Sequence, residues 1–111
     1  MVATAPRMTL STQAVLRALI DDPEREKYGL EMSAATGLAS GTLHPILARL
    51  EKIGWVESSW EDIDASKEGR CRRRYYRITS NGLPIARAAL AEAHAQRVRI
   101  IGGFRPLGET S

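Results

Sequence analysis

The apolar residues between positions 43 and 53 recur with the period of a helix, and this pattern ends at a glycine. They stand at spacings of i, i+3, i+4, i+7 and i+10, and they are Leu43, Ile46, Leu47, Leu50 and Ile53. This spacing predicts a helix with one apolar face that must be buried. Ser40 is a good N-cap and Gly54 a good stop, so we expect the helix to run from about 40 to 53. After Gly54 the pattern becomes typical of strands.

Two runs rich in aromatic and β-branched residues, 55–60 and 72–79, predict the two strands of a hairpin. The polar segment between them fits a long hairpin tip. Residues 80–101 predict a long alanine-rich helix, and Pro84 keeps it from starting much before Asn81, because proline is tolerated only in the first turn. This helix contains a 3-4-3 spacing typical of a coiled-coil seam, formed by Leu83, Ala86, Leu90 and Ala93.

Two more helices are expected before position 40. The first covers 9–21, with Thr9 or Ser11 as its cap, and the second covers 30–36, opened by Tyr28-Gly29 and closed by Gly37. The whole order predicts a mainly α (α+β) fold, a winged helix-turn-helix with a two-stranded β wing and a long C-terminal dimerisation helix. A chain of 111 residues suffices for one core. The expected divisions are an N-terminal arm (1–8), the winged helix-turn-helix (9–79), the dimerisation helix (80–101) and a tail (102–111).

Positive charge is concentrated in one short segment. The whole chain has a formal net charge of only +3, yet residues 67–77 (KEGRCRRRYYR) hold six Lys or Arg against one Glu. Basic residues this close together repel one another unless an anion is nearby. This distribution predicts a polyanionic partner, with double-stranded nucleic acid the first choice.

The two segments YGLEMSAATGLASGTLHPILARLEKIGWVESSWE and GRCRRRYYRITSNG resemble the PadR family of winged-helix transcriptional regulators. The resemblance covers roughly residues 10–95, and the single helix after the wing is similar to the small subtype of the family. It implies a homodimer that binds double-stranded operator DNA and represses transcription. It also implies release of DNA by a small apolar or aromatic effector, as in many members.

Residues for each surface follow from the helix face, the basic wing and the resemblance. The residues expected to contact DNA are Ser40, Thr42, His44 and Arg49 of the third helix and Lys67, Arg70, Arg72, Arg73 and Arg74 of the wing. Strand alternation sends Arg72 and Arg74 to one face and Arg73 to the other. The residues expected at the dimer interface are Leu16, Leu19, Leu83, Ala86, Leu90 and Ala93.

Several classes of protein are disfavoured. No nucleophile–base set, phosphate-binding glycine loop or carboxylate pair of catalytic type is present, so we expect neither an enzyme nor a cofactor. One cysteine and the isolated His44 and His94 predict no metal site. Cys71 lies between arginines, but without a second cysteine we expect it to be incidental. No apolar run approaches the ~18 residues of a membrane span, and no secretory signal is evident, so a cytoplasmic location is expected.

Two other functions fit the same pattern of elements. A MarR-like regulator shares the winged helix but needs longer flanking helices. A protein–protein docking module shares the fold without needing a basic wing. An aromatic ligand could stack on Trp55 or Trp60, although Trp55 is expected in the core.

Overall fold

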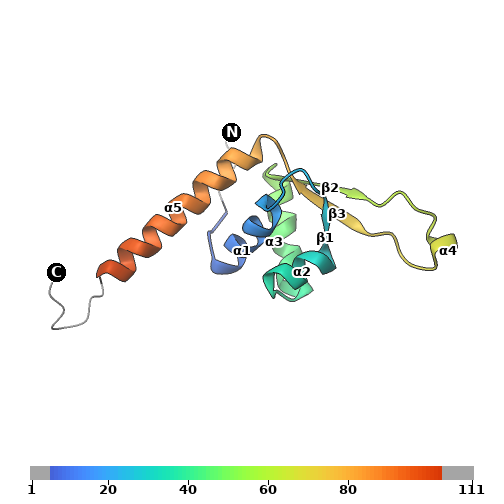
Figure 1. Cartoon of the computed structure of the whole chain (residues 1–111), viewed down its shortest axis with the longest axis horizontal. Helices are drawn as coiled ribbons and strands as arrows, with labels where there is room; N and C mark the ends of the chain where they lie inside the picture. Colours follow the sequence, from blue (N-terminus) through green and yellow to red (C-terminus); the bar gives the residue numbers. More distant parts are fainter. Residues whose placement is uncertain (1–5, 104–111) are drawn as a thin grey trace.

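The computed structural model describes residues 6–103, in which helices and a small sheet follow one another in the predicted order (Figure 1). The elements are α1 (Leu10–Ile20), β1 (Lys27–Tyr28), α2 (Gly29–Thr36), α3 (Ser40–Lys52), β2 (Val56–Trp60), α4 (Ala65–Glu68), β3 (Arg74–Ile78) and α5 (Gly82–Gly103). The mixed fold with a β wing is therefore confirmed.

The core lies where α1, α2 and α3 meet the inner face of the sheet. Its buried hydrophobic residues are Val15, Leu16, Leu19, Met32, Leu43, Ile46, Leu47, Leu50, Trp55, Val56, Tyr76, Ile78 and Ala86. The apolar stripe predicted for α3 is thus buried, with Ile53 packing at its edge. Thr9 caps α1 as expected, because its hydroxyl accepts a hydrogen bond from the Thr12 amide at 3.1 Å.

The sheet has three strands instead of the predicted two, in the order β1-β3-β2 and antiparallel throughout. Lys27 and Tyr28 pair with Tyr76 and Tyr75, so they form a short strand before α2 begins. The Lys27 side chain is buried, and its ammonium donates to the backbone oxygens of Leu19 at 3.2 Å and Asp22 at 3.0 Å. These bonds satisfy one carbonyl group in the last turn of α1 and one in the turn that follows.

The start of α3 and the hairpin tip differ from the prediction. Ser40 is the first residue of α3 rather than its cap, and Ala39 at the cap position has no side chain that can accept a hydrogen bond. The hairpin tip, predicted as irregular, contains the one-turn helix α4. Asp64 caps it by accepting from the amides of Ser66 and Lys67, and Gly69 ends it in a left-handed conformation (φ 69°).

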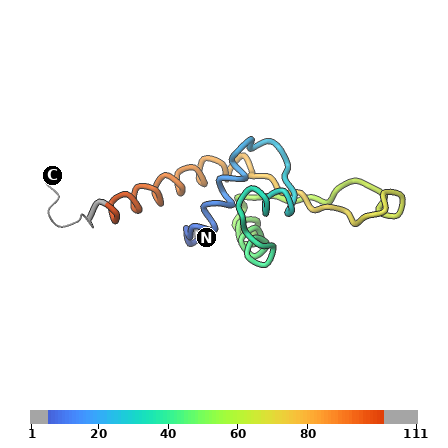
Figure 2. The backbone as a smooth tube through the Cα atoms, turned by 60° about the horizontal axis from the view of Figure 1, so that its bottom comes forward, coloured from blue at the N-terminus to red at the C-terminus, as the bar shows by residue number. Residues whose placement is uncertain are grey.

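The beginning of α5 packs against the rest of the chain, and its end does not. A Cβ on Gly82 would lie 2.6 Å from the Cα and the carbonyl oxygen of Trp55, so only glycine fits where the helix starts. Beyond Leu90 the helix projects from the body, on the side opposite the β2–β3 hairpin (Figures 1 and 2). The molecule is correspondingly elongated, at 67 × 33 × 23 Å. Of the helices in residues 6–103, none has the length and hydropathy to cross a membrane.

Three residues predicted at the dimer interface belong to the core of the protomer. Leu16, Leu19 and Ala86 are at most 1% exposed in a single chain, so a partner could not reach them without opening the core. The prediction for these three was wrong: Leu16 and Leu19 are covered because α1 faces α2, α3 and α5 of its own chain, and Ala86 lies on the part of α5 that joins the core. Leu83, Leu90 and Ala93 keep partial exposure.

Candidate nucleic-acid interface

The outward face of α3 carries the polar residues that the sequence assigned to DNA contact. Ser40, Thr42, His44 and Arg49 are all exposed, whereas the apolar residues between them point into the core. Short hydroxyls and an imidazole near the start of a helix can reach base edges in a major groove. Because no side chain caps α3, its first amides also remain available to an anion.

The imidazole of His44 lies against the first turn of α2. A Cβ added to Gly29 would stand 3.2 Å from the Cε1 atom of His44, which is closer than ordinary van der Waals contact. Glycine at position 29 therefore leaves room for the histidine ring between the two helices. The two helices of the helix-turn-helix meet at this point.

Three basic side chains at the wing tip differ in how they are held. The Arg70 guanidinium donates to both carboxylate oxygens of Glu61, at 2.7 and 3.0 Å. Arg72 is exposed and donates through Nε to the carbonyl oxygen of Ile63 at 3.0 Å. Lys67 is exposed as well, and its ammonium has no ion-pair partner within residues 6–103.

Arg73 and Arg74 point to opposite faces of the hairpin, as strand alternation predicts. The Arg73 guanidinium lies 4.5 Å from the centre of the Tyr28 ring. Arg74 lies on the side of α3, where it donates to the Ser58 hydroxyl at 2.8 Å and approaches Glu51 at 3.6 Å. The exposed Trp60 ring is 5.2 Å from the same guanidinium. Part of the charge in this basic segment is therefore neutralised within the protomer.

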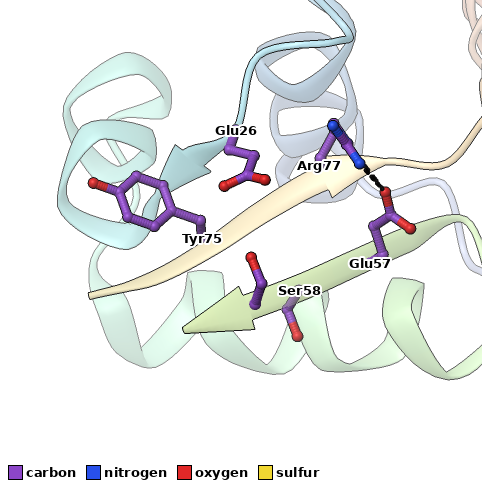
Figure 3. A pocket seen from close by; sticks show the side chains of 6 residues that line it. Glu26, Glu57, Ser58, Tyr75 and Arg77 are labelled. Atoms are coloured by element: carbon purple, nitrogen blue, oxygen red, sulfur yellow. Dashed lines mark hydrogen bonds and ion pairs between the residues drawn. The ribbon is translucent and has the colours of Figure 1, made fainter. Parts of the chain in front are cut away.

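The outer face of the sheet holds a shallow polar depression (Figure 3). Its lining residues are Glu26, Glu57, Ser58, Ser59, Tyr75 and Arg77. Arg77 donates to Glu57 at 2.7 Å across the two strands, and both side chains are about half exposed. Across the described part of the chain, no three His, Cys, Asp or Glu side chains form a group that could hold a metal ion.

The ion pair between Arg70 and Glu61, at the tip end of the wing strands, changes the acidity of the Glu61 carboxyl group. Hydrogen bonding to Arg70 is the main cause that lowers the pKa of Glu61 from 4.5 to about 2, and the Arg73 amide adds to it. The same pairing raises the pKa of Arg70. Glu61 is therefore a stable anion at neutral pH.

A family comparison matches residues 15–88 to the family described as "Transcriptional regulator PadR-like family". The chain belongs to the PadR-like family of transcriptional regulators. Members of this family bind DNA, so the exposed face of α3 and the wing of this PadR-like regulator are its candidate DNA surface. The match covers α2, α3 and the wing, and it confirms the family that the two sequence segments predict. Comparison with curated proteins gives no match.

Solved structures show the same fold. A protein from Streptococcus mutans UA159 is 23% identical, with 98% of this chain and 100% of that chain covered and a TM-score of 0.66. A PadR-like regulator from Bacillus cereus is 20% identical, covers 89% and 92%, and has a TM-score of 0.60. Overoxidized AbfR bound to DNA is 28% identical, covers 80% and 59%, and has a TM-score of 0.60; AbfR comes from Staphylococcus epidermidis. The chain thus spans about three fifths of the AbfR chain.

The predicted residues fall into two groups that the fold separates. One group lies on α3 and the other on the wing, and they approach each other where Arg74 meets Glu51. Glu61 and Tyr28, which hold Arg70 and Arg73, were not predicted from the sequence. For Glu61, the sequence signal that could have identified it is the strand register, because alignment of the hairpin places Glu61 opposite Arg73.

Proposed function

We propose that this chain is a homodimeric repressor that binds operator DNA in a sequence-specific manner. In this proposal α3 reads bases through Ser40, Thr42, His44 and Arg49. The observation that carries it is the outward polar face of α3, whose opposite face is committed to the core, beside a basic wing in a PadR-like regulator. Repression needs only occupancy of a site that the transcription machinery must use, and it follows from the resemblance to PadR regulators.

The wing supplies the backbone contacts in this proposal. Lys67 and Arg72 are exposed at the tip, where they can neutralise phosphates. Arg73 and Arg74 are held on opposite faces, so only one of the two can meet the same groove as the tip. Arg74, on the side of α3, is the better placed.

A second copy of the chain is the partner proposed for the end of α5. Met8 and Leu10 of the N-terminal side and Ala93, Ile100 and Ile101 of α5 line an open groove, and Leu10, Ile100 and Ile101 are more than 60% exposed. An apolar surface of this kind on a small chain is typical of an interface. With two-fold symmetry, two α3 helices would meet half-sites about 10 base pairs apart.

Control by a small apolar or aromatic effector remains part of the proposal. BpsR of Bordetella bronchiseptica has the same fold, and the DNA binding of that protein is regulated by 6-hydroxynicotinic acid. Trp55 is buried and unavailable to a ligand, and Trp60 already stacks near Arg74. An effector would therefore bind outside the tryptophans.

Selection of sites from a pool of random duplexes tests the proposal. The expected result is enrichment of one sequence with two related half-sites, bound more tightly than unselected duplex. If no sequence is enriched and the protein elutes from heparin at low salt, the proposal of sequence-specific DNA binding is wrong. The chain is then better described as a protein–protein docking module. A MarR-like assignment is disfavoured by the PadR-like match.

A further inference from the structure

The carboxylate of Glu61 is surrounded by donors from the other arm of the wing. Oε1 accepts from Arg70 Nη1 at 2.7 Å and from the Arg73 amide at 3.2 Å. Oε2 accepts from Arg70 Nη2 at 3.0 Å and from the Tyr75 hydroxyl at 3.5 Å. The Glu61 side chain is only 15% exposed. We call these four residues the Glu61 cluster.

The cluster closes the wing where its strands end. The Glu61 amide donates to the Arg73 carbonyl at 2.8 Å, beyond the last paired positions of β2 and β3. All residues from 62 to 72 lie in the loop that this contact closes. Within the loop α4 is capped by Asp64, and Arg72 bonds to Ile63, so the tip has its own local order.

An acidic side chain in a surface that meets phosphate needs a structural reason. A carboxylate facing DNA repels the backbone, and it also competes with phosphate for any arginine that it binds. Bidentate pairing of Arg70 with Glu61 satisfies both groups and cancels their charges locally. Arg70 is therefore a poor candidate for a phosphate contact, although it lies in the basic segment.

We propose that Glu61 is a positioning residue for DNA binding. It withdraws Arg70 from the set of phosphate-binding arginines and holds the loop of residues 62–72, so that Lys67 and Arg72 meet the backbone in one arrangement. The inference rests on the proposed function, because it presumes that the wing binds DNA. It corrects the sequence-based role of Arg70 from DNA contact to internal partner.

The test compares four variants of the full chain: Glu61→Ala, Arg70→Ala, the double variant, and Glu57→Ala. Glu57→Ala is the matched control, because it removes an acid of β2 that also pairs with an arginine across the hairpin. Affinity for a short mixed-sequence duplex is measured between about 50 and 200 mM salt.

We expect Arg70→Ala to leave the salt dependence unchanged, since Arg70 makes no phosphate contact. Glu61→Ala should steepen the slope of log K against log salt by about 0.9 for each arginine released to a phosphate. The double variant should return to the slope of the wild type, and Glu57→Ala should keep it. Hydrogen exchange in residues 62–72 should become faster in Glu61→Ala and stay unchanged in Glu57→Ala.

A flatter slope in Arg70→Ala would show that Arg70 binds phosphate, and the proposal would be lost. Equal slopes in Glu61→Ala and Glu57→Ala would overturn it as well. The hydrogen-exchange measurement needs no DNA, so it tests the Glu61 cluster separately from the proposed DNA binding. If the wild type binds no duplex but Glu61→Ala loosens the loop, the proposed function fails while the Glu61 cluster stands as a structural element. Unchanged exchange would refute the cluster whatever the DNA result.

Discussion

Three arginines of the wing already have partners within the protomer. These partners determine how many hydrogen-bond donors each guanidinium has left for a phosphate. Arg70 is paired with Glu61, Arg73 lies on the Tyr28 ring, and Arg74 is shared by Ser58 and Glu51. An arginine on an aromatic ring keeps most of its donors free, while a bidentate pair uses two of five. Binding at Arg70 would therefore first cost the ion pair with Glu61.

The acidity of Glu61 gives a prediction at this scale. Its pKa in the folded protein, about 2, lies below the ordinary value of 4.5, so the stability from this carboxylate is fully present above pH 4.5 and is lost as pH falls through about 2. NMR titration of the Glu61 carboxyl should show its midpoint near pH 2. In Arg70→Ala the midpoint should move toward 4.5, and a midpoint near 4.5 in the wild type would contradict the ion pair.

Cys71 is the one cysteine of the chain and is exposed in the segment that leads into β3. A disulfide is known for AbfR, but this chain has no second cysteine to form one internally. We expect Cys71→Ser to leave DNA affinity and its response to peroxide unchanged. Loss of binding on peroxide treatment in the wild type, absent in the serine variant, would make Cys71 a redox switch.

At the scale of elements, α5 depends on one close approach. Gly82 begins the helix, its amide bonds to the Thr79 hydroxyl at 2.8 Å, and its Cα faces the Trp55 backbone. Gly82→Ala forces these backbones apart, so we expect a loss of about 1–3 kcal/mol in the free energy of unfolding, measured by urea denaturation. Gly41→Ala is the control, because a Cβ there meets nothing within 4 Å. Equal stability of both variants would contradict the close approach.

The elements that could be predicted from sequence are those with a local pattern. α3 was predictable because its apolar period runs over several turns and Gly54 (φ 84°) ends it. β1 is two residues long and exists through pairing with Tyr75 and Tyr76, so no local pattern marks it. The prediction that residues of α1 lie at the dimer interface was wrong for a related reason. A broad apolar face does not indicate whether its own chain or a partner covers it.

The candidate site also has one part that a local sequence pattern predicts and one part that it does not. The exposed face of α3 follows from helical periodicity alone, and its polar residues were predicted correctly as exposed. The partners of the wing arginines depend on the strand register and on the face of the hairpin to which each side chain points. The register brings together residues that are 12 positions apart in the sequence, such as Glu61 and Arg73. The sequence analysis did not predict α4, because a helix of a single turn has no apolar period, even though Asp64 caps it.

For the whole molecule, the projecting end of α5 predicts a dimer. Leu10→Ser and Ile100→Ser change exposed side chains that line the groove, so the protomer should stay folded while the assembly weakens. Sedimentation of the wild type at micromolar concentration should give twice 12.2 kDa, and these variants should shift toward the monomer. Leu30→Ser is the matched control, being 74% exposed on α2 away from the groove. A wild-type monomer at this concentration would refute the dimer.

The most direct test of the central claim separates the base-reading helix from the phosphate-binding wing. Affinity for the selected duplex and for a random duplex is measured at several salt concentrations for Thr42→Ala, His44→Ala and Arg72→Ala. The helix variants should lose about 1–3 kcal/mol on the selected duplex only, with the salt slope unchanged. Arg72→Ala should weaken both duplexes alike and flatten the slope by about 0.9 for each phosphate that is no longer neutralised. The reverse assignment of these effects, or no effect in either set, would contradict the account.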